Sequence, residues 1–429
     1  MKSLIAVFPS VSVSRGPLFI LILCMMASML PSGPSAAAPP RYESPPVLKA
    51  SVLLPPEMVS GPLFRVDDEV PTDGLMGRYT LRSELGTFVV PGRELLRIRI
   101  AELPAIQQIE AMSKSKVFVD AVGRAAAKPL ESAANIVTHP VETVQSLPAG
   151  ISRLFDRVSL GAQKISEAAA DPTQSDSKRA QETMSRVGSV TITALGFEQG
   201  RRQLAKSLGV DPYTTNPVLA EKLTDAAWVA FSGKLAVNIL TTAVVPASMA
   251  ISGTSITNDL VYDTPAADLI NMNKQKMLNL GASQAQAQAL LNNRWYSLSV
   301  LTSLMTELER LTGVAGRSEV IELAATAQNE EEARFFASGV RMLARLHMTD
   351  RPIGKVIGRG TVIGVTSNGG IIVPAPVDYV SWTERIGRFA QRPDLKAKQQ
   401  TAWLTGKTSP VAQKGFSGLG WKLYIAPFE

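Results

Sequence analysis

The sequence predicts a mainly α protein: a helical bundle or helical-hairpin body with a small N-terminal β-meander and a small C-terminal α+β module. Apolar residues recur at helical spacing in the body, residues 103–348. Short runs of alternating polar and apolar residues at 74–102 predict the meander. An Asn-Gly pair at 368–369, between two apolar runs, predicts a β-hairpin within the module, 349–429.

The first 37 residues have the pattern of a signal peptide. Arg15 precedes an apolar stretch, Leu18–Leu30, and two small residues, Ser35 and Ala37, stand where a signal peptidase cuts. The apolar stretch has 13 residues before a proline, whereas a membrane-spanning helix needs about 20. We therefore expect export to the periplasm or cell envelope of a bacterium, with cleavage after Ala37.

The next two segments differ in composition. Eight prolines between 38 and 73 predict an extended, proline-rich linker. The β-meander, 74–102, contains three alternating runs, each predicting a strand. The predicted strands are 79–84, 87–90 and 95–101. In the last of them Arg97 and Arg99 share one face, which is either a solvated strand face or an anion-binding stripe.

Composition narrows the classes of function. The 429 residues are 45% hydrophobic, and their formal charge of +7 falls to about +5 when Lys2 and Arg15 leave with the signal. A mild excess spread along the chain disfavours nucleic acid as a partner, because nucleic acid needs clustered basic residues, and it fits an anionic membrane surface. The single cysteine, Cys24, lies in the signal, so we expect no disulfide in the mature protein.

Few residues offer catalytic chemistry. The histidines are His139 and His347, and their spacing fits neither a metal site nor a catalytic triad. We therefore expect no metal and no cofactor. The best carboxylate pair is Asp259 with Asp263, which a hydrolase could use as acid and base. Asp263 also precedes a Thr-Pro helix start, where an acidic residue is ordinary.

Two groups of residues are candidates for binding. Asp211, Tyr213 and Asn216 belong to a tight corner between two predicted helices; they could line a ligand site, but turn chemistry explains each of them. Trp382 and Trp421 lie in the C-terminal module. Tryptophan is enriched at contact surfaces, although a small module also needs large residues to build a core.

One more candidate is an apolar stretch, Leu235–Ile251, which predicts either a core helix broken by Pro246 or a helix that dips into a membrane surface.

Together the patterns predict an exported, non-catalytic cell-envelope protein that acts by binding or scaffolding an unidentified envelope component. Two alternatives stay open. One is a histidine-independent carboxylate hydrolase acting on envelope polymers, and the other is a peripheral membrane or lipid-binding protein.

Overall fold

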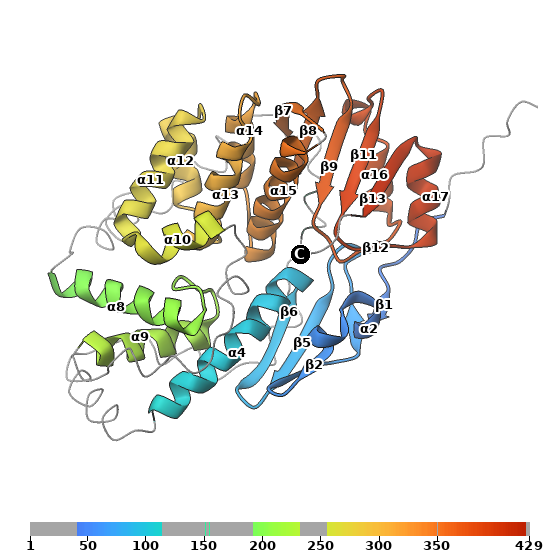
Figure 1. Cartoon of the computed structure of the whole chain (residues 1–429). Coiled ribbons are helices and arrows are strands. Elements are labelled where there is room, and N and C mark those ends of the chain that lie inside the picture. Colours follow the sequence, from blue (N-terminus) through green and yellow to red (C-terminus); the bar gives the residue numbers. More distant parts are fainter. Residues whose placement is uncertain are drawn as a thin grey trace, which may run out of the picture. The chain divides into compact units, whose positions relative to one another are not determined.

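The computed structural model describes residues 41–113, 151, 154, 192–231, 255–349 and 351–425 (Figure 1). The expected signal peptide, His139 and the apolar stretch Leu235–Ile251 lie outside these residues. All the described residues belong to a single unit of the chain. Their elements fall into an N-terminal β region, a central group of helices and a C-terminal sheet.

The expected linker, 38–73, is folded where it is described. Its elements are β1 (Val47–Lys49), α2 (Ala50–Leu53), α3 (Pro56–Val59), β2 (Ser60–Gly61), β3 (Phe64–Val66) and β4 (Glu69–Pro71). Two of its prolines stand at element ends: Pro56 begins α3, where a missing N–H is tolerated, and Pro71 ends β4. Val66 and Val70 are buried in a hydrophobic core, so the described part is not an extended linker.

Two of the three expected meander strands form. They are β5 (Arg78–Ser83) and β6 (Gly86–Pro91), which pair antiparallel within a sheet of order β2-β3-β5-β6. The third prediction was wrong, because residues 95–101 belong to a helix, α4 (Arg93–Ser113).

The helical period of α4 explains this error. Over seven residues the apolar pattern fits both a strand and a helix, but the buried Leu96, Leu103 and Ile106 continue the helical spacing well beyond the run. Arg97 and Arg99 therefore form neither a strand face nor an anion-binding stripe on one. Burial lowers the pKa of Arg97, and Arg99 is only 8% exposed.

Helices make up the central described residues. They are α8 (Ile192–Leu208), α9 (Pro217–Phe231), α10 (Ser255–Asp263), α11 (Ala266–Asn279), α12 (Gln284–Leu291), α13 (Leu298–Arg310), α14 (Arg317–Ala324) and α15 (Glu330–Met348). Gly209 follows α8 with a φ of 68°, the left-handed conformation that glycine adopts at low cost. This turns the chain into a corner that leads to α9.

The C-terminal elements are β7 (Ile353–Gly358), β8 (Val362–Thr366), β9 (Ile371–Ala375), β10 (Tyr379–Val380), α16 (Glu384–Ala390), a 3₁₀ turn (Pro393–Leu395), β11 (Gln400–Leu404), β12 (Lys407–Thr408), α17 (Pro410–Gly418) and β13 (Trp421–Ile425). β10 pairs in parallel with β12, and the other five strands form one sheet. The strand order is β13-β11-β9-β8-β7. The strands β9, β11 and β13 are parallel and are joined through α16 and α17, whereas β7, β8 and β9 pair antiparallel.

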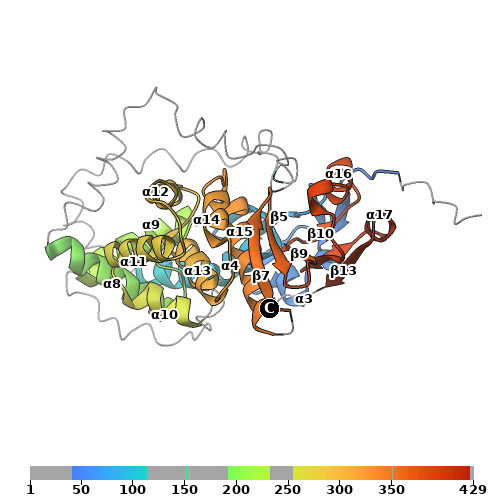
Figure 2. The ribbon, with the colours of Figure 1, turned by 90° about the horizontal axis from the view of Figure 1, so that it is seen from above.

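The predicted fold class, mainly α, was wrong: about 52% of the described residues are helical and 20% are in strands, a mixed α/β architecture. The sheet lies between α15 on one side and α16 with α17 on the other (Figure 2). Phe336 and Val340 of α15 share one hydrophobic core with Ile363 and Ile372 of the sheet. The sheet is therefore central to the fold and not a small appendage to a helical bundle.

The start of the described chain, residues 41–46 before β1, is bound to the C-terminal elements, and we call this segment the N-terminal strap. Glu43 lies in this strap, and its Oε2 accepts hydrogen bonds from the backbone N–H of Trp382 at 2.7 Å and from the hydroxyl of Ser409 at 2.5 Å. The backbone N–H of Glu43 also donates to the carbonyl of Trp382 at 2.8 Å. Residues more than 300 positions apart in the sequence are thereby held together.

We expect Glu43→Ala to lower the free energy of unfolding by about 2 kcal/mol, because it removes the acceptor of two hydrogen bonds. Urea unfolding of the purified variant measures the change. Glu57→Ala on α3, at an exposed position, serves as the control and should change stability by less than about 0.5 kcal/mol. Equal stabilities of the two variants would show that the strap does not stabilise the fold.

Candidate functional site: a buried charged centre and an open pocket

Helix α4 begins at the carboxyl end of strand β9. Asp378 lies three residues after β9, and its Oδ2 accepts a hydrogen bond from the backbone N–H of Gly77 at 2.9 Å. The backbone N–H of Arg93 lies 3.1 Å from both carboxylate oxygens of Asp378 and donates to them. The hydroxyl of Tyr79 donates to the same carboxylate at 3.1 Å. Arg93 is the first residue of α4, and negative charge is stabilised at this end of a helix. Burial raises the pKa of Asp378, while Arg93 opposes the rise.

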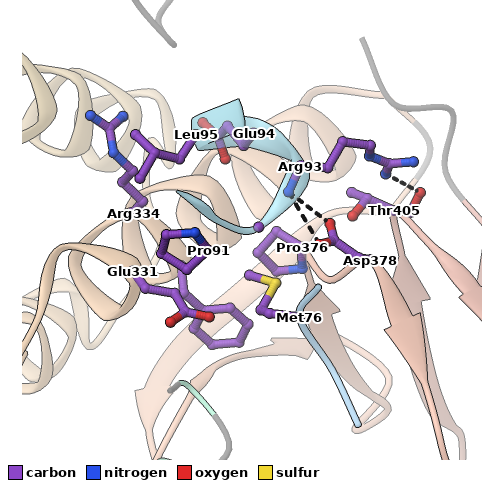
Figure 3. A pocket seen from close by; sticks show the side chains of 12 residues that line it. Met76, Pro91, Arg93, Glu94, Leu95, Glu331, Arg334, Pro376, Asp378 and Thr405 are labelled. Carbon is purple, nitrogen blue, oxygen red and sulfur yellow. Dashed lines mark hydrogen bonds between the residues drawn. The ribbon is translucent and has the colours of Figure 1, made fainter. Parts of the chain in front are cut away.

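The side chain of Arg93 reaches across to the next strand of the sheet. Its Nη2 donates to the carbonyl of Thr405, the residue after β11, at 2.8 Å (Figure 3). Open α/β sheets bind ligands at the carboxyl ends of their strands. In this chain, the start of α4 occupies that position next to β9 and β11.

A small cavity of about 30 Å³ lies beside this contact (Figure 3). Its lining consists of Met76, Pro91, Gly92, Arg93, Glu94, Leu95, Glu331, Arg334, Phe335, Pro376, Asp378 and Thr405. A space of this size holds about one water molecule. It is too small for an organic substrate, so the buried centre is a packed and charged junction between α4, α15 and the sheet.

Glu331 of α15 is another carboxyl group of this centre whose pKa is raised by burial. Its side chain is 6% exposed, and its Oε2 accepts a hydrogen bond from Nη1 of Arg78 at 2.7 Å. No described residue donates to its other oxygen, which is buried. Burial raises the pKa of Glu331 to about 7; Asp73 and Asp378 add to this rise, and Arg78 opposes it.

A third buried carboxyl group, that of Glu102, lies further along α4. It accepts hydrogen bonds from Nη1 of Arg99 at 3.1 Å and from Nδ2 of Asn216 at 2.8 Å. The hydroxyl of Thr214 also donates to it. Three donors therefore surround a side chain that is completely buried, which is the condition under which an internal charge is tolerated.

Glu330 extends this network to α15. The hydroxyl of Thr215 accepts from Nη2 of Arg99 at 2.8 Å and donates to Oε1 of Glu330 at 2.6 Å. Nε of Arg334 donates to the same oxygen at 2.8 Å. Although burial raises the pKa of Glu330, the cations Arg334 and Arg99 outweigh it and the net shift is downward. Charged side chains thus connect α4 to α15.

The corner residues that the sequence proposed for binding take part in buried contacts. Oδ1 of Asp211 accepts from the hydroxyl of Ser299 at 2.5 Å and from the backbone N–H of Tyr213 at 2.7 Å. Asn216 donates to Glu102. Burial raises the pKa of Asp211 and raises that of Tyr213 to about 12. Turn chemistry and the Glu102 network account for the contacts of Asp211 and Asn216.

The other sequence candidates lie apart from the buried centre. Asp259 and Asp263 are exposed on α10, and Asp263 forms an ion pair with Lys206 at 2.7 Å. Trp382 and Trp421 are buried, with ring centroids 5.2 Å and 6.1 Å from that of Phe416. These tryptophans therefore build the core of the C-terminal elements.

The described histidine, His347, makes a structural contact. Its Nδ1 accepts from the backbone N–H of Ile353 at 3.1 Å. This hydrogen bond connects the last turn of α15 to the first residue of β7.

An open pocket of about 240 Å³ adjoins the buried centre, and we call it the α16 pocket. Its lining residues are Pro45, Asp73, Leu75, Thr383, Glu384, Arg385, Ile386 and Arg388. Leu75 and Ile386 give it an apolar floor, since both are almost completely buried. Oδ1 of Asp73 accepts from the backbone N–H groups of Leu75 at 2.9 Å and Met76 at 2.7 Å, which fixes the direction of this carboxylate.

The residues of both sites were missed by the sequence analysis. Asp378 has one local signal, because it follows directly on a long apolar run, Ile371–Val377, and an acid at the end of a buried strand is a common site residue. Glu331 and Asp73 have none: Glu331 looks like an ordinary first-turn acid of a helix, and Asp73 looks like a turn residue.

Within the part of the chain that the structure describes, no helix is both long and apolar enough to cross a bilayer. In the same residues, no three side chains of Asp, Glu, His or Cys are grouped as metal ligands would be. The chain was compared with protein-family models, with curated proteins and with solved structures, and none of them matches it.

Proposed function

We propose that the protein is an exported, non-catalytic cell-envelope protein that acts by binding, and that a small ligand binds in the α16 pocket. The observation that carries this proposal is an open pocket of about 240 Å³ after the carboxyl end of β9, beside the helix that follows. Ligands of open α/β sheets bind at this end of the strands. An apolar floor with a few polar groups around it is typical of small-molecule sites.

The rim of the α16 pocket favours a ligand that carries both signs of charge. Asp73 and Glu384 are acidic, and Arg385 and Arg388 are basic. Arg388 forms an exposed ion pair with Glu384 at 3.2 Å, so both signs of charge stand side by side on the rim. A ligand with one sign of charge would meet like charges on this rim, whereas a zwitterion complements both. The volume is below the roughly 300 Å³ at which drug-sized pockets begin. A ligand of metabolite size, such as an amino acid, fits these limits.

The arrangement of the buried carboxylates supports binding over catalysis. Asp378 holds the start of α4, and Glu102 holds the corner before α9. The cavity beside Asp378 has room for about one water molecule. A carboxylate hydrolase would need its two acids on either side of a substrate.

Export is tested by fractionation of cells that express the chain with a C-terminal tag. We expect the tagged protein in the periplasm or envelope, with an N-terminus that begins at Ala38 after removal of the signal. An intact N-terminus on a protein that stays in the cytosol would contradict the proposal.

Ligand binding is tested by thermal unfolding of the mature protein with separate panels of zwitterionic, anionic, cationic and neutral small metabolites. We expect a zwitterion to raise the midpoint by several degrees, because a ligand that binds only the folded state stabilises it. Glu384→Trp places a bulky ring on the exposed rim and should abolish the shift.

Lys414→Trp is the matched control, since it places the same ring at an exposed position of α17, outside the pocket. This variant should keep the full thermal shift. The proposal fails if no compound stabilises the wild-type protein, or if the stabilising compound acts equally on Glu384→Trp.

A further inference from the structure

The positive charge of the chain is concentrated near its C-terminus. Residues 349–429 contain 11 basic and five acidic residues, a net charge of +6 out of +7 for the whole sequence. The expectation of an excess spread along the chain was therefore wrong. An asymmetry of this kind indicates an anionic partner for the charged part.

Three of these basic residues lie at the edge of the sheet that is formed by the amino ends of its parallel strands. Gln400 of β11 is level with Ile371 of β9 and with Trp421 of β13, so the amino ends of the three parallel strands share an edge. Lys396 and Lys398 precede β11, and Lys422 is the second residue of β13. We call Lys396, Lys398 and Lys422 the amino-edge lysines.

The amino-edge lysines are exposed, and none of their side chains forms an ion pair or a hydrogen bond with the described residues. The nearby acid Asp394 is already paired with Arg392 at 2.6 Å. The other acids among the described C-terminal residues, Asp378 and Glu384, follow the carboxyl end of β9. The positive charge of the edge is therefore not neutralised by the described chain.

An exposed apolar side chain accompanies the lysines. Leu419 is 37% exposed and stands two residues before β13, at the same edge. Basic side chains next to an exposed leucine match the two parts of a lipid surface, because the lysines meet phosphate groups and the leucine meets the acyl boundary.

We infer that this edge docks on the surface of a bilayer that contains anionic phospholipids. The inference is independent of the α16 pocket, which lies after the carboxyl end of β9 and therefore away from the amino ends of these strands. Docking through the lysines would leave that pocket open to its ligand. The same protein can thus be peripheral to a membrane and bind a small molecule.

Sedimentation of the mature protein with vesicles tests the inference. We expect binding to phosphatidylglycerol vesicles at low salt, none to phosphatidylcholine vesicles, and a steep loss of binding as salt is added, because salt screens exposed charges. The triple variant K396Q/K398Q/K422Q should bind roughly 100-fold more weakly, since each lysine near an anionic surface contributes about fivefold.

The triple variant K49Q/R65Q/K274Q removes the same charge from β1, β3 and α11 and should bind as the wild type does. Thermal unfolding checks that both variants are folded. The inference is overturned if the wild type ignores anionic vesicles at low salt, if both triple variants weaken binding equally, or if the protein binds soluble dextran sulfate but no vesicle.

Discussion

Replacement of Asp378 by alanine is expected to lower the free energy of unfolding by about 3–5 kcal/mol. The substitution leaves the N–H groups of Gly77 and Arg93 and the hydroxyl of Tyr79 without their acceptor. All of these donors converge on one carboxylate that is 4% exposed, so water replaces it poorly. Urea unfolding followed by circular dichroism measures the change.

Tyr79→Phe measures the contribution of the tyrosine hydroxyl to stability apart from that of the two backbone donors. This variant loses one hydrogen bond of 3.1 Å and keeps the ring in the core, so we expect a loss of about 1 kcal/mol. A loss from Asp378→Ala no larger than that from Tyr79→Phe would mean that the contact with the start of α4 contributes little.

The second large effect is a pH dependence of stability that comes from Glu331. Its pKa is about 7 in the folded protein against an ordinary 4.5. The folded state therefore binds more protons between pH 4.5 and 7, and the contribution of this group to the free energy of unfolding falls as the pH rises through that window. A shift of this size corresponds to about 3 kcal/mol.

Glu331→Gln isolates this contribution, because glutamine keeps the shape of the side chain and does not titrate. The stability of the variant relative to the wild type should rise by about 3 kcal/mol from pH 4 to pH 8. Denaturant unfolding at half-unit steps of pH gives the difference curve, in which the titration of all other groups cancels. A flat curve would contradict a raised pKa at Glu331.

Local signals in the sequence predicted local structure correctly. The Asn368–Gly369 pair was expected to turn a hairpin, and β8 and β9 do pair antiparallel around it, with Gly369 at a φ of 80°. This succeeds because the turn chemistry is contained in a few neighbouring residues. The strand prediction at 95–101 was wrong because this local signal was too short. Seven residues cannot distinguish a strand from the start of a long helix.

The sheet and the buried centre depend on contacts that a sequence pattern does not show. β11 pairs in parallel with β9 and β13, and each of these partners is separated from it by a helix. Whether Trp421 builds a core or a contact surface is decided by α16 and α17, which cover it. The composition of the module was compatible with either role, and tertiary packing places Trp421 in the core.

The distance in sequence between Asp378 and α4 also sets an order of events in folding. The acceptor for the first residue of α4 arrives 285 residues later, and the anchor of the strap at Ser409 is 366 residues from Glu43. Contacts of such long range form late, because a long loop must close first. The N-terminal β region thus reaches its final stability only when nearly the whole chain has been made. For the export that we propose, the delay would leave the N-terminal region without these stabilising contacts until the C-terminal end has followed.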